Sequence, residues 1–251
     1  MTQQLQNKNA IIYGGSGSIG GASARAFARE GATVFLAGRT LKTLEAVAED
    51  IKAAGGSAHV AELDALDESA VNEHAAAVAA QAGSIDVSLN LVSRGDRHGV
   101  TLVDMTAEDF ARPVTTGLMS NFNTARAAAR HMAEQGSGVI LTLTSASSRG
   151  TAPTLGSTGV ADAATETFLR YLAAENGPQG VRVVGLWAAG IPETFDPPLP
   201  PEVSQRMAEM TMLHRMQSLT QVVDSFVFLA SDRAAGITGT ILNVTCGLVS
   251  G

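Results

Sequence analysis

Short runs of apolar and β-branched residues alternate along the chain with longer, alanine-rich stretches whose apolar positions recur at helical spacing. The short runs predict strands at Ala10–Tyr13, Thr33–Ala37, Ala58–Leu63, Val87–Leu91, Val139–Thr144, Arg182–Trp187 and Ile241–Val244. The longer stretches predict helices near Gly20–Glu30, Leu41–Ala54, Glu68–Ala82, Ala107–Glu134, Gly156–Glu175 and Thr220–Ala230. Strict alternation of strand and helix predicts the α/β class, with a Rossmann-like, doubly wound parallel sheet of seven strands covered by helices on both faces.

The chain contains no stretch that resembles an interdomain linker or an internal repeat, so residues 1–251 are expected to form one domain. The one break in composition is the segment 191–201, which holds five of the eight prolines and leads into a methionine-rich stretch ending near Met216. It follows the sixth predicted strand, at the sheet edge where open α/β sheets bind ligands. Residues 191–216 are therefore interpreted either as a lid over a substrate or as a plain surface connection.

Composition excludes several classes of function. The net charge is −7 and no run of five basic residues occurs, which argues against a nucleic-acid or anionic-membrane partner. The single cysteine, Cys246, rules out an intrachain disulfide, and no apolar stretch is long enough for a membrane span. The polar N-terminal residues lack an apolar signal core, so a cytoplasmic protein is expected. No His, Cys and carboxylate cluster has metal-ligand spacing, so no metal is predicted.

A glycine-rich segment follows the first predicted strand and opens the first predicted helix. Residues 14–20 read Gly-Gly-Ser-Gly-Ser-Ile-Gly, and Gly15, Gly17 and Gly20 satisfy G-x-G-x-x-G. Glycines at these positions allow the backbone to approach a pyrophosphate, which the free N–H groups of the helix N-terminus then bind. This context favours a dinucleotide site over a glycine-rich turn without a ligand.

The end of the second predicted strand bears on the choice of dinucleotide. It reads Leu-Ala-Gly-Arg-Thr over residues 36–40, and lacks the acid that usually accepts from the ribose 2′-hydroxyl of NAD. Arg39 instead suits a phosphate, so NADP(H) is preferred over NAD(H). The alternative is that Arg39 is a solvated residue that opens the next helix.

Taken together, these motifs resemble those of the short-chain dehydrogenase/reductase family, nearly from end to end. Residues 14–20 resemble the family's T-G-x-x-x-G-x-G, with Tyr13 in place of the threonine and Ser18 in place of the middle glycine. Residues 85–90 resemble the segment that ends in N-N-A-G, and Leu-Thr-Ser at 143–145 matches the strand whose final serine is catalytic in the family. Pro153 and residues 228–239 complete the likeness.

The resemblance implies a set of residues around the cofactor, among them an aspartate that faces the adenine at position 64. The expected cofactor-binding residues are Gly14, Ser16, Ser18, Ile19, Gly20, Arg39, Thr40, Asp64, Asn90, Asp162 and Ile191. It also implies that the predicted helices 107–134 and 156–175 build a homotetramer, with a dimer as the next choice, although their small residues also suit an internal face.

The family's catalytic tyrosine and lysine are missing. They stand thirteen and seventeen residues after the catalytic serine, and counting from Ser145 reaches Thr158 and Asp162. The helical asparagine of the family aligns with Gly117. Neither tyrosine of the chain, Tyr13 or Tyr171, is spaced to replace the missing one, and the three lysines, at positions 8, 42 and 52, all precede the second half of the fold. The candidate catalytic residues are therefore Ser145, Thr158 and Asp162.

Three functional hypotheses follow from this altered site. The first is an NADPH-dependent oxidoreductase in which Ser145 polarises a carbonyl and the proton donor is Ser147, Arg149, Asp162 or a residue of the loop 93–98, which includes His98. The second is a reaction that needs less help from a protein acid, such as reduction of a protonated imine, an elimination or an isomerisation. The third is a nucleotide-binding subunit without turnover. Asp162 and Glu166 lie one helical turn apart, and only Asp162 is expected in the site.

Overall fold

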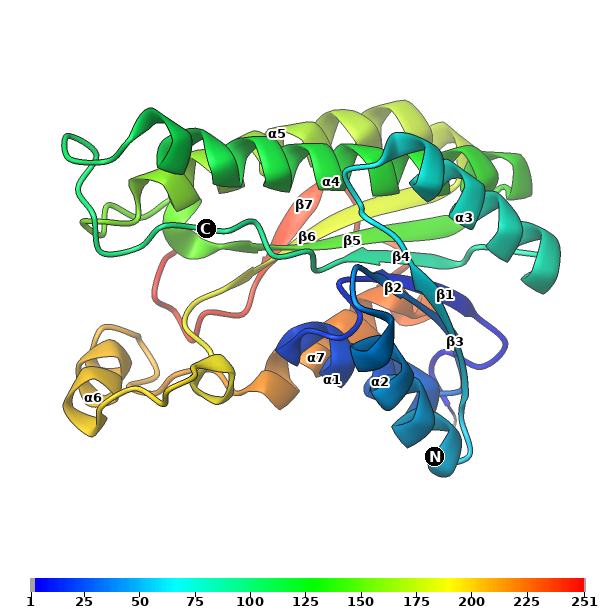
Figure 1. Ribbon diagram of the computed structural model, residues 1–251, viewed down its shortest axis with the longest axis horizontal. Coiled ribbons are helices and arrows are strands. Elements are labelled where there is room, and N and C mark those ends of the chain that lie inside the picture. The colour runs from blue at the N-terminus through cyan, green and yellow to red at the C-terminus, as the bar shows by residue number, and fades with distance from the viewer. Residues whose placement is uncertain (1–2, 251) are drawn as a thin grey trace.

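The computed structural model describes residues 3–250, and one parallel sheet organises them (Figure 1). The strand order is β3-β2-β1-β4-β5-β6-β7, with every neighbouring pair parallel. The strands are β1 (Asn9–Tyr13), β2 (Thr33–Gly38), β3 (Ser57–Glu62), β4 (Val87–Asn90), β5 (Gly138–Ser145), β6 (Val181–Ala188) and β7 (Thr240–Asn243). The predicted seven-stranded, doubly wound sheet is thus confirmed.

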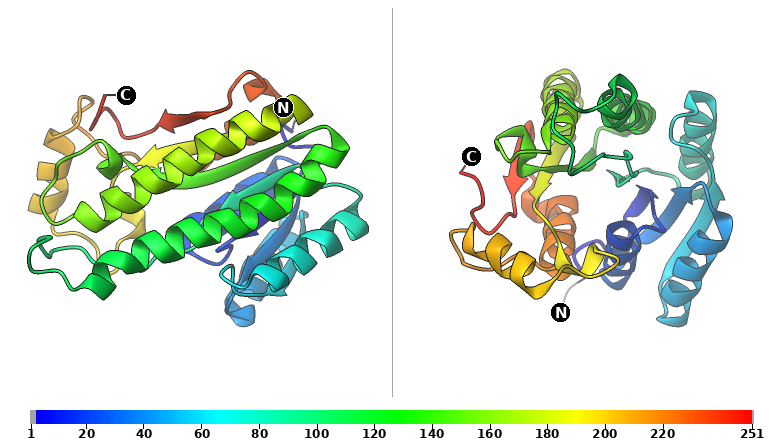
Figure 2. Two further views of the ribbon diagram at one scale, coloured as in Figure 1. Left: turned by 90° about the horizontal axis from the view of Figure 1, so that it is seen from above. Right: turned by 60° about the vertical axis from the view of Figure 1, so that its left-hand side comes forward.

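Helices cover both faces of this sheet. The α-helices are α1 (Ser18–Arg29), α2 (Leu41–Ala53), α3 (Glu68–Ala82), α4 (Ala107–Gln135), α5 (Gly156–Asn176), α6 (Pro201–Glu209) and α7 (Leu219–Ala230). Short 3-10 segments are η1 (Ala146–Ser148), η2 (Gly177–Gln179), η3 (Pro192–Thr194) and η4 (Asp232–Ala234). Helices α1, α2 and α7 share one hydrophobic core with the sheet, and α3, α4 and α5 share the other. Figure 2 shows α4 and α5 side by side along their face.

The two cores explain why the strand sequences are almost continuously apolar. In β1, Ala10 and Ile12 enter the core beneath α1, whereas Ile11 and Tyr13 enter the core beneath α3. Because side chains of a strand alternate between the two faces, a strand buried on both faces needs apolar residues at every position.

The chain order reverses between β1 and β4, which pair side by side and end together at Tyr13 and Asn90. Crossovers to opposite sides of this point leave the loops after β1 and β4 splayed apart, which is where open α/β sheets bind ligands. The loop after β4 and the segment around α6 lie at the same end of the molecule (Figure 1).

Every predicted strand and helix is present, with ends shifted by no more than two residues. The difference lies in the segment 191–216, where the sequence analysis predicted no helix but the structure has η3 and then α6 over Pro201–Glu209. Proline at the first position of a helix has a suitable φ and forfeits no hydrogen bond, so prolines here begin a helix as well as interrupt the chain. Among residues 3–250, no helix is both long and apolar enough to cross a membrane.

Candidate active site

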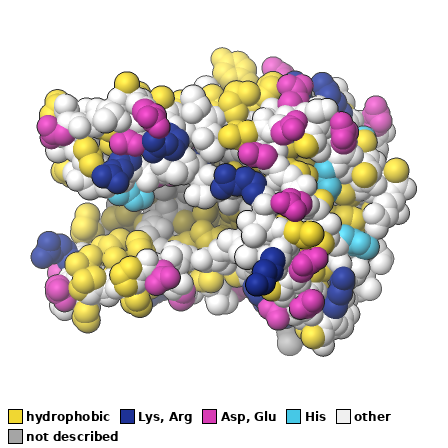
Figure 3. Space-filling view, viewed as in Figure 1, with side chains coloured by type: hydrophobic (Ala, Val, Ile, Leu, Met, Phe, Trp, Pro, Cys, Tyr) yellow, Lys and Arg dark blue, Asp and Glu magenta, His cyan; other side chains and the backbone are white. Residues whose placement is uncertain are grey.

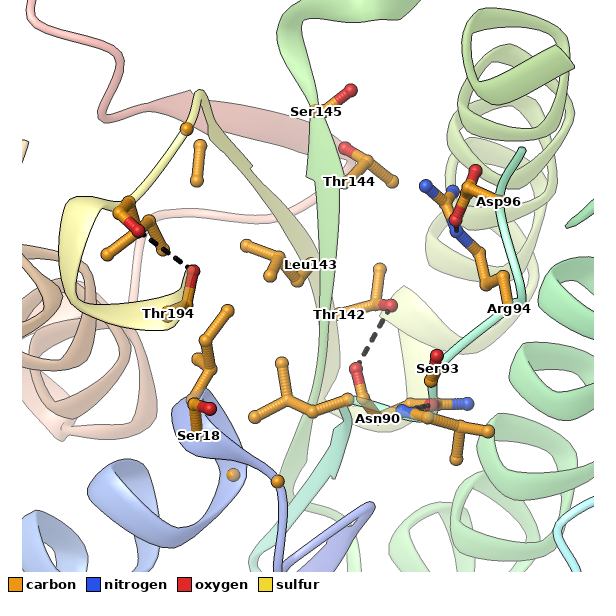
Figure 4. A pocket seen from close by; sticks show the side chains of 18 of the residues that line it. Ser18, Asn90, Ser93, Arg94, Asp96, Thr142, Leu143, Thr144, Ser145 and Thr194 are labelled. Atoms are coloured by element: carbon orange, nitrogen blue, oxygen red, sulfur yellow. Dashed lines mark hydrogen bonds and ion pairs between the residues drawn. The ribbon is translucent and has the colours of Figure 1, made fainter. Parts of the chain in front are cut away.

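A cavity of about 430 Å³ opens at the carboxyl ends of the central strands. The Gly17–Gly20 segment lines one end, and the last residues of β5, Thr142–Ser145, line the wall leading to the other. Figure 4 shows Arg94 and Asp96 on one side of β5 and Thr194 on the other. The surface seen in Figure 3 is hollowed between two rims. The phosphate motif and the candidate catalytic serine therefore border one continuous space.

The glycine loop, residues 14–20, is closed by backbone contacts that side chains would prevent. A Cβ on Gly20 would lie 2.1 Å from the carbonyl oxygen of Gly14, and Gly14 itself has a φ of +73°. Helix α1 begins at Ser18, and its cap residue Gly17 has no side chain to occupy the free N–H groups. The helix N-terminus has no side-chain cap, and the glycine backbone packs closely before it, so its N–H groups fit the pyrophosphate of a dinucleotide.

The predicted adenosine-side residues lie at the ends of β2 and β3. Arg39 and Thr40 are exposed where α2 begins, and Thr40 is the cap residue of that helix. Within residues 3–250, Arg39 forms no ion pair, so its guanidinium is available to a ligand phosphate. Asp64 is exposed, and its carboxylate accepts a hydrogen bond of 3.0 Å from the backbone N–H of Leu66.

Two further predicted cofactor residues, Asn90 and Ile191, line the cavity and are buried. The Asn90 amide donates to Thr124 Oγ1 at 3.1 Å, and its oxygen accepts from the Val92 N–H at 2.9 Å. These bonds hold the loop after β4 against α4, next to the point where the strand order reverses.

Ser145 is the last residue of β5, and its side chain faces a carboxylate. Its Oγ donates to Asp162 Oδ2 at 2.5 Å, and its backbone N–H donates to the same oxygen at 3.1 Å. The Ser147 N–H in turn donates to Ser145 Oγ at 3.2 Å. Asp162, which the sequence count predicts at the position of the family lysine, is thus in direct contact with the serine.

Arg94, from the loop after β4, supplies the positive charge of the site. Its Nη1 lies 2.5 Å from Asp162 Oδ1 and its Nε lies 3.2 Å from Asp96 Oδ2. The side chain of Asp162 is fully buried, while those of Arg94 and Asp96 are each 16% exposed. We refer to Arg94, Asp96 and Asp162 as the buried ion cluster.

Gly117 makes room for this arginine. A Cβ at Gly117 would lie 2.6 Å from Arg94 Cδ, so a side chain there would displace the arginine. Gly117, which the sequence analysis aligned with the helical asparagine of the family, thus leaves room for the stem of Arg94. Asn121, one turn further along α4, donates to the carbonyl oxygen of Gly117 at 2.9 Å and accepts from Thr142 Oγ1 at 2.7 Å.

Thr158, which the sequence count predicts at the position of the family tyrosine, contacts the buried ion cluster. Its hydroxyl donates to Asp96 Oδ1 at 2.9 Å and lies 3.2 Å from Nε2 of His98. Because the threonine proton goes to Asp96, the arrangement implies that His98 donates its Nε2 proton to Thr158. His98 is exposed, as the sequence suggested, but it is also tied to the candidate site.

Burial and charge act in opposite directions on the cluster. Burial raises the pKa of Asp162 above its ordinary value, while the charge of Arg94 and the hydrogen bonds from Ser145 oppose that rise. Burial lowers the pKa of Arg94, but Asp162 and Asp96 together more than offset the effect, so that arginine stays protonated. The cluster thus holds one positive and two negative groups when both carboxylates are ionised.

The two tyrosines and the second acid of α5 lie outside the buried ion cluster. Tyr13 is buried in the core, where desolvation raises the pKa of its phenol. Tyr171 is 68% exposed and lines a second cavity, on α4 and α5, with Phe122 and Phe168. Glu166 is buried and accepts a 2.6 Å hydrogen bond from the indole Nε1 of Trp187, so the two acids of α5 face different partners.

Sequence reasoning identified Ser145, Thr158 and Asp162 but missed the ion pair between Arg94 and Asp162. It included Arg94 only as part of a loop that might donate a proton. The available signal was a combination of three substitutions: an acid for the lysine, a glycine for the helical asparagine, and an arginine shortly after β4. No fixed spacing connects these positions, so their contact emerges only in the fold.

A doubly wound seven-stranded sheet, a glycine loop after β1 and a serine at the end of β5 together define a class of nucleotide-dependent oxidoreductases. The chain belongs to the short-chain dehydrogenase/reductase family, because the family model described as Enoyl-(Acyl carrier protein) reductase matches residues 14–249. The relatives of this chain are accordingly dehydrogenases and other oxidoreductases of that family.

Two bacterial hydroxysteroid dehydrogenases illustrate the similarity. The chain is 28% identical over 245 residues to the 7alpha-hydroxysteroid dehydrogenase of Escherichia coli (strain K12), an alignment that covers 97% of this chain and 95% of the relative. It is 31% identical over 247 residues to the 3alpha-hydroxysteroid dehydrogenase of Mediterraneibacter gnavus, covering 97% and 98%. A solved 7 alpha-hydroxysteroid dehydrogenase complexed with NADH and 7-oxo glycochenodeoxycholic acid superimposes with a TM-score of 0.89 at 27% identity, covering 100% of this chain and 97% of that one.

Proposed function

We propose that the protein is an NADP(H)-binding oxidoreductase that acts on a carbonyl- or imine-type small molecule through an atypical site, with Thr158 and Asp162 in place of the family tyrosine and lysine. The observation that carries this proposal is the single cavity that joins the glycine loop to Ser145. A nicotinamide dinucleotide bound along it would supply hydride chemistry, and Gly14, Ser16, Ser18, Ile19, Gly20, Asn90 and Ile191 would hold its central part.

The preference for NADP(H) rests on Arg39. An exposed guanidinium at the end of β2, without an ion-pair partner in the described chain, can bind a 2′-phosphate through charge-assisted hydrogen bonds. Thr40 lies beside it, and Asp64, two residues after the end of β3, would face the adenine. The solved relative named above was complexed with NADH, so the proposed preference rests on this chain's own Gly-Arg-Thr sequence and not on that relative.

The test is a calorimetric titration of NADPH and NADH into the wild type and Arg39→Ala. Losing one charge-assisted phosphate contact is expected to weaken NADPH binding about 10- to 100-fold while leaving NADH binding unchanged. Arg29→Ala removes an equal charge from the exposed end of α1 and serves as the matched control. Equal affinities of the wild type for NADPH and NADH would contradict the preference, and binding of neither would contradict the whole proposal.

Two alternative functions deserve a direct test, because the site's hydroxyl protons are already engaged. Ser145 donates to Asp162, and Thr158 donates to Asp96. With both protons held by carboxylates, a nucleotide-binding pseudoenzyme or a non-redox lyase or isomerase remains an alternative to the oxidoreductase. Turnover of a carbonyl or imine with NADPH that is slowed by Ser145→Ala supports the oxidoreductase, whereas cofactor binding without turnover across a broad panel supports the pseudoenzyme.

We also propose roles for two outlying regions. Residues 191–216 would form a substrate lid, because the methyl groups of Met207 and Met216 and the ring of Phe195 crowd Gly190 on the cavity wall. The face of α4 and α5 that carries the half-buried Phe122 and Phe168 and the exposed Tyr171 would assemble the homotetramer, or failing that a dimer, which light scattering of the purified protein tests. The cytoplasmic location expected from the sequence stays a prediction.

A further inference from the structure

The hydroxyl of Ser145 presents an acceptor, not a donor, to a ligand in the cavity. A serine hydroxyl has one proton and two lone pairs. The proton is donated to Asp162 Oδ2 at 2.5 Å, and one lone pair accepts from the Ser147 N–H at 3.2 Å. Ser145 lines the cavity, so the remaining lone pair is what a bound molecule meets. A ligand with an O–H group fits this arrangement, and a carbonyl oxygen, which can only accept, does not.

Asp162 behind the serine is built to hold its negative charge. Three donors converge on its two oxygens: Arg94 Nη1 on Oδ1, and both the N–H and the Oγ–H of Ser145 on Oδ2. The side chain is fully buried, so bulk water does not compete for these bonds. A proton on Oδ2 would reverse the bond to Ser145, because the carboxylic acid would then donate and the serine proton would turn toward the cavity.

We propose that Asp162 and Ser145 form a two-residue proton relay that replaces the missing tyrosine in the interconversion of an alcohol and its carbonyl compound. This inference rests on the proposed function, since it needs a bound nicotinamide as the hydride partner. Ser145 is the residue that touches the substrate, and Asp162 acts through it.

The reaction balances in both directions. In oxidation, the carbinol C–H bond breaks, and a bound oxidised nicotinamide would supply the acceptor for the hydrogen and its electron pair. The alcohol O–H proton passes to Ser145 Oγ, the serine's own proton passes to Asp162 Oδ2, and the C=O double bond forms. In reduction the same protons return, from Asp162 to Ser145 and from Ser145 to the new alkoxide oxygen. Thr158 takes no part, because its proton is held by Asp96.

The protonation state of Asp162 therefore decides whether the site binds the alcohol or the ketone. The charged groups around Asp162 determine that protonation state. Arg94 contacts Asp162 directly, Asp96 lies on the far side of Arg94, and His98 reaches only Thr158. Glu166, one turn along α5, faces Trp187 instead. Removal of the Arg94 charge favours protonated Asp162 and shifts the relay toward the ketone-binding form.

The experiment measures binding in dead-end complexes, where no reaction occurs: alcohols with the NADPH-bound protein and the matching ketones with the NADP⁺-bound protein. The probes are alcohol and ketone pairs of increasing size, from cyclohexanol and cyclohexanone to fused-ring pairs. At pH 8 the wild type is expected to bind the alcohol of at least one pair about tenfold or more tightly than the ketone, because the ketone leaves two acceptors facing each other.

The variant Asp162→Asn reverses the direction of the hydrogen bond between residue 162 and Ser145 Oγ and keeps the shape of the side chain. Its amide oxygen is expected to face Arg94, because the charged donor makes the stronger hydrogen bond, and its N–H₂ group then faces Ser145. The N–H₂ group donates to Ser145 Oγ and leaves the Ser145 N–H without its acceptor, and the serine proton points into the cavity. We expect the alcohol-to-ketone preference to invert in this variant and to fall to near unity in Ser145→Ala. Glu166→Gln makes the same change of acid to amide one turn away and is expected to keep the wild-type preference.

Turnover gives a second readout. The rate of alcohol oxidation should rise with pH as Asp162 ionises, and Arg94→Met should move this rise to higher pH because the arginine no longer lowers the pKa of Asp162. Two results with the wild type would overturn the relay: binding of no alcohol of the panel, or a preference for the ketones at pH 8. A folded Asp162→Asn variant that keeps the alcohol preference would overturn it as well. NADPH binding in the same samples shows whether the proposed function itself survives.

Discussion

The most informative perturbation of this protein is the removal of Arg94 by the substitution Arg94→Met. Methionine keeps an unbranched apolar stem against Gly117 but removes the guanidinium that pairs with Asp162 at 2.5 Å. The Asp162 carboxylate is fully buried, so it would lose its cation without gaining water. Breaking one partner of a buried ion pair costs about 3–5 kcal/mol of unfolding free energy. The loss of Asp96's contact adds little, because that carboxylate retains some exposure.

The cost should depend on pH, and its sign follows from linkage. Burial raises the pKa of Asp162, and without Arg94 the pKa rises further above the unfolded value of about 3.9. A raised folded pKa stabilises the protein fully below the unfolded pKa, and this stabilisation is lost as the pH rises through the folded pKa. Arg94→Met should therefore lose stability relative to the wild type as the pH increases from about 4 upward, and least at the acid end.

Urea unfolding at several pH values, followed by far-ultraviolet circular dichroism, measures this directly. The double variant Arg94→Met/Asp162→Leu completes a mutant cycle, and its cost should be smaller than the sum of the two single costs by about 2 kcal/mol or more, since both charges leave together. A cost below about 1 kcal/mol at pH 7, or one that does not change with pH, would refute the assignment of Arg94 as the cation that Asp162 requires.

Two further predictions test the surroundings of the site. Gly117→Ala should reproduce part of the Arg94→Met phenotype, because a Cβ 2.6 Å from Arg94 Cδ forces the arginine away from Asp162. Urea unfolding is expected to show a free energy of unfolding lower by about 1–3 kcal/mol, and no decrease would show that the arginine has room to move. Tyr13→Phe should leave stability unchanged or raise it by about 1 kcal/mol, because the buried hydroxyl has no hydrogen-bond partner within residues 3–250; a loss of activity with stability intact would instead indicate a chemical role for this tyrosine.

Much of this architecture could be predicted from the sequence, because it depends on the local pattern of apolar and polar residues. Short, β-branched runs such as Val181–Ala188 are typical of strands buried on both faces, and their alternation with amphipathic helices leaves few topologies besides a doubly wound sheet. The glycine loop was equally legible, since it directly joins β1 to α1. Helical spacing also places Thr158 and Asp162 one turn apart on α5, near the end of β5, once Ser145 is taken as the reference.

What the sequence alone determined about this protein is thus its sheet and its glycine-rich loop, together with the expectation that Thr158 and Asp162 stand where the family has a tyrosine and a lysine. Only the tertiary structure decided what replaced them. Arg94 and Asp162 are 68 residues apart, and they meet because β4 and β5 pair side by side and because α4 offers the gap at Gly117 between them. The buried carboxylate of Asp162 requires a cationic partner, but this requirement does not identify Arg94 as that partner. The choice depends on distances between side chains across three elements, which no local pattern encodes.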